Sequence, residues 1–166
     1  PASGLPALKD AIVRKLERDN GLSYDTKQIA ISCGAKHTLY NLFQVLLGEG
    51  DEVIVPAPYW VSYPEQIGCA GGKTVVVQTS EADGFVMKPD ALKEKLTDRT
   101  RFLVLNSPSN PAGGVYDQGD LEAIAQVCLE NNIGVISDEI YEHLIYEGRT
   151  HHSIAQVSPE MKDLTL

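Results

Sequence analysis

The stretch NSPSNPAGGVY, residues 106–116, decides how this sequence is interpreted. It follows the apolar run 101–105 (RFLVL), which predicts a buried strand. Two X-Pro steps and a Gly-Gly pair come next. They predict a stiff, sharp turn, because proline fixes φ and glycine tolerates the backbone angles of a sharp bend. A core strand therefore ends in a stiff polar turn that carries two asparagines, Asn106 and Asn110.

Short apolar runs alternate with helical patterns on both sides of this turn. Strands are predicted over 28–34, 51–60, 73–79, 101–106 and 133–141, and helices over 4–21, 35–50, 88–98 and 117–132. The strands are apolar on both faces, which indicates a mostly parallel sheet covered by helices on both sides. We therefore predict an α/β fold with three layers and a mostly parallel sheet.

The composition limits the classes of function. The chain has 166 residues, a hydrophobic fraction of 43% and a net charge of −9, which predict one acidic globular domain. Nucleic acid is not an expected partner, because neutralising phosphates needs a basic face. No apolar run has the length of a membrane span, so we expect no membrane contact. The cysteines Cys33, Cys69 and Cys128 match no zinc or disulfide spacing, which favours a cytoplasmic protein.

Four polar segments follow predicted strands, and ligands of open α/β sheets bind beyond the carboxyl ends of the strands. They are Gly34-Ala35-Lys36, Pro58-Tyr59-Trp60, the turn from Asn106 to Asn110, and Asp138 to Tyr141. We expect all four segments to meet at one edge of the sheet.

Each segment has a functional and a plain interpretation. Backbone N–H groups at the helix start 34–36 suit one phosphate, or the segment is a tight turn with a solvated Lys36. In the functional interpretation Trp60 stacks on the flat ring of a ligand, and in the plain one its side chain packs in the core. Asp138 holds a proton on a ring nitrogen, or it caps the next turn; a buried carboxylate there also needs a cation nearby. Tyr141 shares a face with Asp138 if the chain turns helically.

No metal is expected. His151 and His152 lack the carboxylate or cysteine spacing of a metal site, and we expect them to form a surface pair in a loop.

The segments PASGLPALKDAI (1–12), GAKHTLYNLFQVLLGEGDEVIVPAPYWVSYP (34–64), LNSPSNPAGGVY (105–116) and SDEIYEHLIYEG (137–148) resemble one family. They are similar to the large domain of class I aminotransferases, which are fold-type I pyridoxal-phosphate enzymes, and above all to bacterial aspartate aminotransferases. The matches run in the same order along nearly the whole chain.

The resemblance implies a role for seven residues. Gly34, Ala35 and Lys36 would lie at the phosphate of the cofactor pyridoxal 5′-phosphate. Trp60 would stack on its ring and border the substrate. Asn110 and Tyr141 would hydrogen-bond its 3′ oxygen, with Asn110 also approaching the substrate. Asp138 would pair with the ring nitrogen.

The resemblance also implies that residues 1–166 are part of a cofactor-binding large domain. The family's Schiff-base lysine would lie beyond Leu166, so no catalytic residue is assigned in this chain. The small domain with its substrate arginine would follow, and a tyrosine that reaches across a homodimer would precede Pro1. We expect the 166-residue chain alone to be inactive.

The activity implied is transamination between an amino acid and a 2-oxo acid such as 2-oxoglutarate. The amino acid is expected to be aspartate, with a prephenate/arogenate pair as a further substrate. Two alternatives stay open: a pyridoxal-phosphate lyase of the same fold, and a non-catalytic sensor domain of a transcription regulator. In the regulator, a DNA-binding module would precede Pro1.

Overall fold

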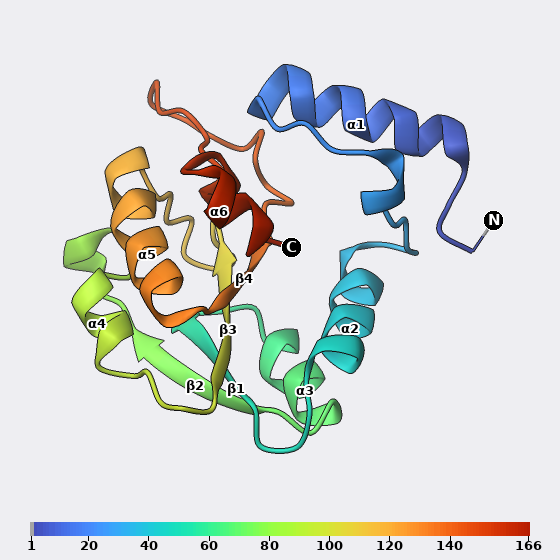
Figure 1. Cartoon of the computed structure of the whole chain (residues 1–166). Helices are drawn as coiled ribbons and strands as arrows, with labels where there is room; N and C mark the ends of the chain where they lie inside the picture. Colours follow the sequence, from blue (N-terminus) through green and yellow to red (C-terminus); the bar gives the residue numbers. More distant parts are fainter. Residues whose placement is uncertain (1) are drawn as a thin grey trace.

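A four-stranded sheet forms the centre of the computed structural model, which describes residues 2–166 (Figure 1). Its strands are β1 (Glu52–Ala57), β2 (Lys73–Gln78), β3 (Thr100–Asn106) and β4 (Gly134–Asp138). They lie in the order β2-β1-β3-β4, and every pairing is parallel. All four carboxyl ends therefore meet at one edge, which confirms the predicted α/β fold with a parallel sheet.

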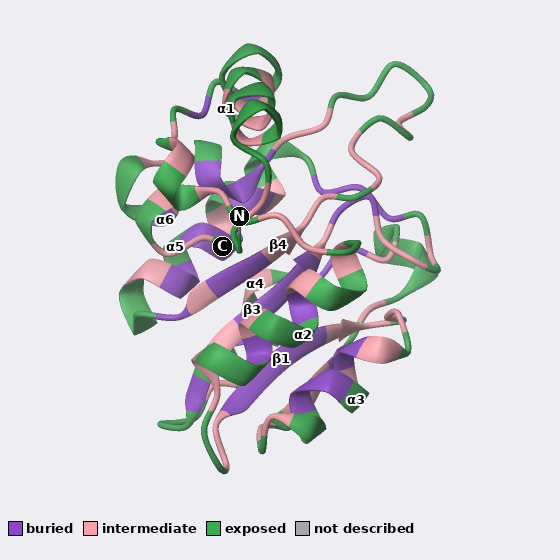
Figure 2. Cartoon of the chain, turned by 90° about the vertical axis from the view of Figure 1, so that its right-hand side faces the viewer, coloured by how far each residue is buried: buried purple, intermediate pink, exposed green. Residues whose placement is uncertain are grey.

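Helices cover both faces of the sheet and make three layers. One face carries α2 (Ala35–Leu46) and α3 (Ser62–Cys69), and the other carries α4 (Pro89–Lys93), α5 (Gln118–Asn131) and α6 (Pro159–Asp163). Alternate strand residues divide between the two layers of core, because successive side chains of a strand point to opposite faces. Val53 and Val104 pack toward α2 and α3, whereas Ile54 and Leu103 pack toward α5. Figure 2 shows the burial concentrated on the strands and on the helix surfaces that face them.

Local sequence signals explain where α5 begins and ends. The Asp117 side chain accepts a hydrogen bond from the Asp120 backbone N–H and caps the first turn. Asn132 takes a left-handed conformation at φ 52° and ends the helix. The inward face predicted from the sequence is buried: Leu121, Ile124, Ala125 and Cys128.

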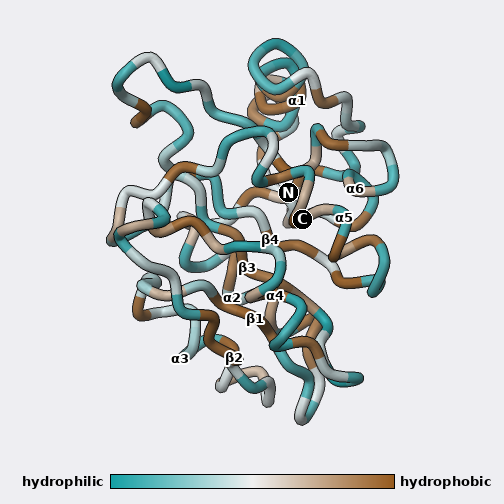
Figure 3. The backbone as a smooth tube through the Cα atoms, turned by 90° about the vertical axis from the view of Figure 1, so that its left-hand side faces the viewer, coloured by the Kyte–Doolittle hydropathy of each residue, from teal (hydrophilic) through white to brown (hydrophobic). Residues whose placement is uncertain are grey.

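Helix α1 (Pro6–Asn20) lies beyond the three layers, at the top of Figure 1. Residues 2–166 only partly cover its apolar stripe and the N-cap Leu5, since Leu8 is 46% and Leu5 is 64% exposed. Polar contacts hold it instead: Lys15 pairs with Glu142, and the Gln156 amide donates to the Asn20 carbonyl. Figure 3 shows that the strands carry hydrophobic colours in the centre of the molecule. No helix in the described residues is both long and apolar enough to cross a membrane.

Several predicted elements differ from the structure. The predicted strand 28–34 is wrong: the short 3-10 helix η1 (Thr26–Gln28) leads into an irregular segment whose Ile31 N–H donates to the Ser3 carbonyl. A β-prone run becomes a strand only where a neighbouring strand pairs with it. Helix α3 was not predicted, and the predicted helix 88–98 shortens to α4. The remaining short helices are η2 (Glu81–Asp83) and η3 (Ile154–Gln156), and Thr165 forms a parallel bridge with Val135 of β4.

Candidate cofactor site

A cavity of about 270 Å³ lies at the carboxyl edge of the sheet. The residues that line it come from all four predicted segments and from α3: Gly34, Ala35, Lys36, Trp60, Tyr63, Asn106, Asn110, Asp138, Ile140 and Tyr141. All seven residues to which the sequence assigned a role are therefore brought together around one cavity. The convergence follows from the parallel topology, because each strand delivers its following segment to the same edge.

The start of α2 forms one end of this cavity. Gly34 has φ 87° and ψ 161°, a conformation that is essentially restricted to glycine, and no atom lies within 4 Å of a Cβ built there. The N–H groups of Ala35 and Lys36 find no acceptor among residues 2–166, as is usual in the first turn of a helix. Together with the helix dipole, these donors favour an anion.

The Lys36 side chain extends from the start of α2 to the Trp60 ring. Its Nζ lies 5.0 Å from the centroid of the Trp60 ring, within the range of a cation–π contact. Lys36 is exposed, as the plain interpretation expected, and its ammonium also contacts the aromatic wall of the cavity.

Trp60 and Tyr63 reach the cavity from the turn between β1 and α3. The Tyr63 N–H donates to the Trp60 carbonyl at 3.1 Å, which closes the turn that begins the helix. The two rings meet edge to face, with centroids 5.4 Å apart and planes at 85°. Trp60 is half-buried and Tyr63 is 2% exposed, so Tyr63 belongs to the core while its hydroxyl reaches the site.

Asp138 ends β4 and is half-buried. Its Oδ2 accepts a hydrogen bond of 2.6 Å from the Tyr63 hydroxyl, and its Oδ1 accepts one of 3.3 Å from the Ile140 N–H. The second contact is the turn cap that the plain interpretation expected. The expected cation is missing from the described chain: neither a lysine nor an arginine of residues 2–166 pairs with Asp138.

Tyr63 remains a donor to this carboxylate. Burial of the ring and the negative charge of Asp138 both raise the pKa of Tyr63 above its ordinary value. The phenol is therefore neutral at physiological pH.

The turn 106–116 joins the ends of β3 and β4. The Asn106 amide donates to the Asp138 carbonyl at 2.8 Å, and its Oδ1 accepts the Asn110 N–H at 2.7 Å. The Asn110 side chain in turn lies 3.4 Å from the Tyr141 hydroxyl. Asn106 thus fixes the backbone, whereas the Asn110 and Tyr141 side chains meet on the cavity wall.

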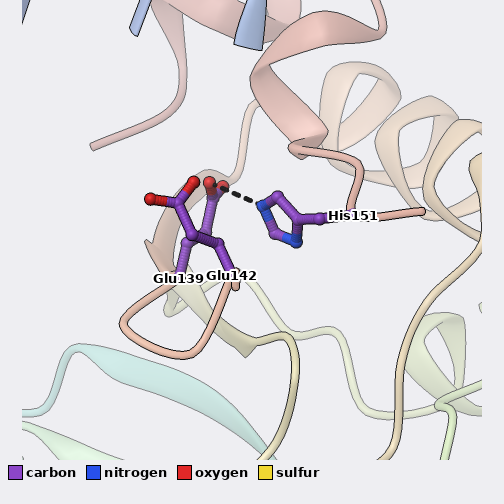
Figure 4. Close-up of side chains that lie close together, drawn as sticks. All are labelled: Glu139, Glu142 and His151. Atoms are coloured by element: carbon purple, nitrogen blue, oxygen red, sulfur yellow. Dashed lines mark hydrogen bonds and ion pairs between the residues drawn. The ribbon is translucent and has the colours of Figure 1, made fainter. Parts of the chain in front are cut away.

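A second polar cluster lies outside this cavity and consists of Glu139, Glu142 and His151 (Figure 4). The expectation that His151 lies on the surface is wrong, because its side chain is 10% exposed and its Nε2 lies 3.1 Å from Glu139 Oε2. The long-range contact of His151 with the segment after β4 leaves no trace in the local sequence pattern.

Hydrogen-bond donors already surround this cluster, although its possible ligand atoms lie within 4.8 Å of one another. The hydroxyls of Ser137 and Ser153 donate to Glu139 Oε1 at 2.7 and 2.6 Å. The Lys15 ammonium contacts Glu142 Oε2 at 2.5 Å, where a metal ion would compete with it. Burial opposes ionisation of Glu139, yet the hydrogen bonds from His151, Ser153 and Ser137 outweigh it and lower the pKa of Glu139. The cluster is an ion-pair and hydrogen-bond network.

Among the described residues that line the cavity, Tyr63 is the one that lies outside the four segments predicted from the sequence. A signal was present, because Tyr63 follows Trp60 by three residues and such residues share a face in a helical turn. The signal could be used only after the start of α3 was known.

The fold and the cavity define an α/β domain with a ligand site at the carboxyl edge of its sheet, lined by a helix start, an aromatic wall and a carboxylate. Comparison with known proteins narrows this class. The family model "Aminotransferase class I and II" matches residues 1–166, and the chain belongs to this family.

Individual relatives agree with this assignment. The chain is 53% identical over 166 residues to an aspartate aminotransferase of Bacillus sp. (strain YM-2), covering all of this chain and 42% of the relative. It is 48% identical over 160 residues to an aspartate/prephenate aminotransferase of Thermus thermophilus, covering 96% of this chain and 41% of the relative. The solved structure of a Thermus thermophilus aspartate aminotransferase with maleate superposes with a TM-score of 0.94 at 46% identity, covering 99% of this chain and 42% of that one. The chain thus spans about two fifths of the length of these relatives.

Proposed function

We propose that the complete protein containing this chain is a pyridoxal-phosphate-dependent aminotransferase. The observation that carries the proposal is the cavity at the sheet edge, where Asp138 lies without a lysine or arginine partner from the described residues. A half-buried carboxylate with that environment suits a cationic group supplied by a ligand. The family membership of the chain supports the same activity.

The residues present fit the cofactor at its phosphate end. The unpaired N–H groups of Ala35 and Lys36 would hold the phosphate oxygens at the positive end of α2. Gly34 would let the backbone approach the phosphate closely, because no side chain stands there. The Lys36 ammonium, which lies against Trp60, adds positive charge to the cavity lining.

The other end of the cavity fits the ring. Asp138 would pair with the ring nitrogen and keep a proton on it. Asn110 and Tyr141 would donate to the 3′ oxygen, and Trp60 would stack on the ring and border the substrate, which Asn110 would also contact. When bound, pyridoxal phosphate supplies an electron sink for the charge left when an amino acid loses its α-proton. In this assignment Asp138 strengthens that sink by holding the positive charge at the ring nitrogen.

We propose aspartate as the amino donor and a 2-oxo acid such as 2-oxoglutarate as the acceptor. The names of the relatives support aspartate and favour prephenate as a second acceptor to be tested. The lysine that forms the Schiff base and the arginine that binds the substrate carboxylate are assigned to parts of the complete protein outside residues 1–166.

The proposal extends to the setting of the protein. We propose a cytoplasmic homodimer whose ligands are amino acids and 2-oxo acids. The net charge of −9 on this chain supports the absence of a nucleic-acid or membrane partner.

The experiment is an assay of the complete protein with pyridoxal phosphate. We expect the bound cofactor to give an absorption band and aspartate with 2-oxoglutarate to yield oxaloacetate and glutamate. Release of ammonia without transfer to the oxo acid would identify a lyase instead. Cofactor binding without turnover of any amino acid would favour the sensor domain. Failure to bind the cofactor at all would overturn the proposal.

A further inference from the structure

Tyr63 makes a closer contact with Asp138 than any other side chain in the described part of the molecule. Its hydroxyl lies 2.6 Å from Oδ2, at the short end of the range for a phenol donating to a carboxylate. The other contact recorded for the carboxylate is the longer Ile140 N–H bond to Oδ1. Removing the phenol oxygen would therefore leave Oδ2 without a donor from residues 2–166.

The position of the phenol is fixed by its surroundings. Tyr63 is fully packed at the start of α3, and the edge-to-face contact with Trp60 restricts its ring. The hydroxyl is consequently aimed at the end of β4 by the β1–α3 turn, which also carries the aromatic wall of the cavity.

We propose that Tyr63 is a positioning residue: its phenol holds the Asp138 carboxylate in one orientation. This inference rests on the proposed function, in which Asp138 pairs with the ring nitrogen of the cofactor. A donor fixed at Oδ2 restricts the carboxylate to one rotamer, which keeps the second oxygen directed at the cavity. Tyr63 acts on the reaction through Asp138 and needs no contact with the substrate.

The first test uses the complete protein without cofactor, so that it is independent of the proposed function. Tyrosines are labelled with ¹³C at Cζ, and the Tyr63 signal is assigned with Tyr63→Phe. We expect Asp138→Asn to shift the Tyr63 signal and to let this phenol ionise at a lower pH. The exposed Glu122 of α5 provides the control variant Glu122→Gln, which should leave the signal in place. A Tyr63 chemical shift that is the same with and without Asp138→Asn would overturn the inference.

The second test uses the protein loaded with pyridoxal phosphate. Loss of one hydrogen bond to a charged group predicts that Tyr63→Phe lowers kcat about tenfold, with KM changed less than about twofold. The pH profile of the cofactor absorbance should shift as well. Tyr116→Phe is the matched control, because Tyr116 is another buried phenol and its hydroxyl accepts the Met87 N–H away from the cofactor cavity. Equal effects of the two substitutions would mean that Tyr63 is merely structural.

A double variant separates action through Asp138 from other effects. In the Asp138→Asn background, Tyr63→Phe should leave the cofactor absorbance profile unchanged. The same shift in both backgrounds would overturn the positioning role. Tyr63→His keeps a ring that can donate, and it should restore most of the kcat lost in Tyr63→Phe. If the unaltered protein binds no cofactor, the proposed function fails, while the labelled-tyrosine experiment still decides whether Tyr63 controls Asp138.

Discussion

Asp138 is the carboxylate that lines the cavity in residues 2–166, and the proposed reaction depends on its charge. We predict that Asp138→Asn lowers kcat of the complete protein by about 100-fold or more, since one preorganised electrostatic contact in an active site is commonly worth that much. The free energy of unfolding should change little, because the amide oxygen of Asn can still accept the Ile140 N–H while its NH2 donates to the Tyr63 hydroxyl oxygen. Steady-state kinetics and thermal unfolding measure the two effects.

The matched control for this prediction is Glu122→Gln, which neutralises an exposed carboxylate on α5. It should alter neither kcat nor the absorption spectrum of the cofactor. An Asp138→Asn protein with the original turnover and spectrum would contradict the role assigned to Asp138.

At this scale the sequence was informative where function depends on strand ends. Asp138, Asn110 and Tyr141 could be placed together because a parallel sheet sends the segments after its strands to one edge. The same reasoning could not predict the positions of Tyr63 and His151. Tyr63 lies on α3, a helix that was not predicted, and His151 contacts Glu139 from a distant loop.

Gly34 is the N-cap that precedes helix α2, and a larger residue does not readily adopt its backbone conformation. We predict that Gly34→Ala lowers the affinity for pyridoxal phosphate about tenfold or more, because backbone strain of roughly 1–3 kcal/mol would move the phosphate donors. Cofactor titration by absorbance or fluorescence measures the loss.

Gly21 supplies the control for Gly34. It also has a positive φ, 63°, and no atom lies within 4 Å of a Cβ built there, but it ends α1 far from the cavity lining. Gly21→Ala should lower the unfolding temperature without changing cofactor affinity. Equal loss of affinity in both variants would show that strain acts on the whole fold.

The Glu139 network connects the end of β4 with the segment around η3. Since the pKa of Glu139 is lowered on folding, its ionised form stabilises the fold above the ordinary value of 4.5, and this contribution disappears as the pH falls through the lower folded value. We predict that Glu139→Gln reduces the free energy of unfolding at pH 7 by roughly 1 kcal/mol or more. The deficit should shrink in acid.

Unfolding curves recorded from about pH 7 to about pH 3 check this pH dependence over the range in which carboxylates titrate. Glu130→Gln, an exposed change on α5, should leave the curves unchanged. A deficit of constant size across that range would rule out the ionisation of Glu139 as its cause.

The elements differ in how well their sequences predict them. The strands β1 to β4 are apolar on both faces and bounded by turn residues, so the parallel sheet followed from pattern alone. The run 28–34 has the same character, but strand pairing depends on distant neighbours and not on the run itself. The spacing of leucines correctly predicted helix α1, although residues 2–166 cover only part of its apolar stripe.

The molecule as a whole spans about two fifths of the length of its relatives, and its cavity contains a single amine, Lys36, among the described residues. That ammonium rests on Trp60, and we assign it to the phosphate side. We therefore predict that the purified 166-residue chain does not transaminate and binds pyridoxal phosphate only without a covalent bond. Borohydride treatment followed by mass spectrometry should find no cofactor attached.

The complete protein is the positive control, and we expect borohydride to fix the cofactor to one of its lysines outside residues 1–166. Covalent labelling of Lys36, or turnover by the isolated chain, would refute this division of roles.

The parallel sheet also has an opposite edge, where the chain returns before each strand. The connections 47–51, 70–72 and 94–99 lie there and contribute no residue to the cavity lining. In the connection 94–99 every residue except Leu96 is exposed, and exposed connections tolerate insertion well. This connection is therefore the place to graft a fluorescent reporter or an affinity tag in protein engineering, because extra residues there would leave the edge with the cavity undisturbed.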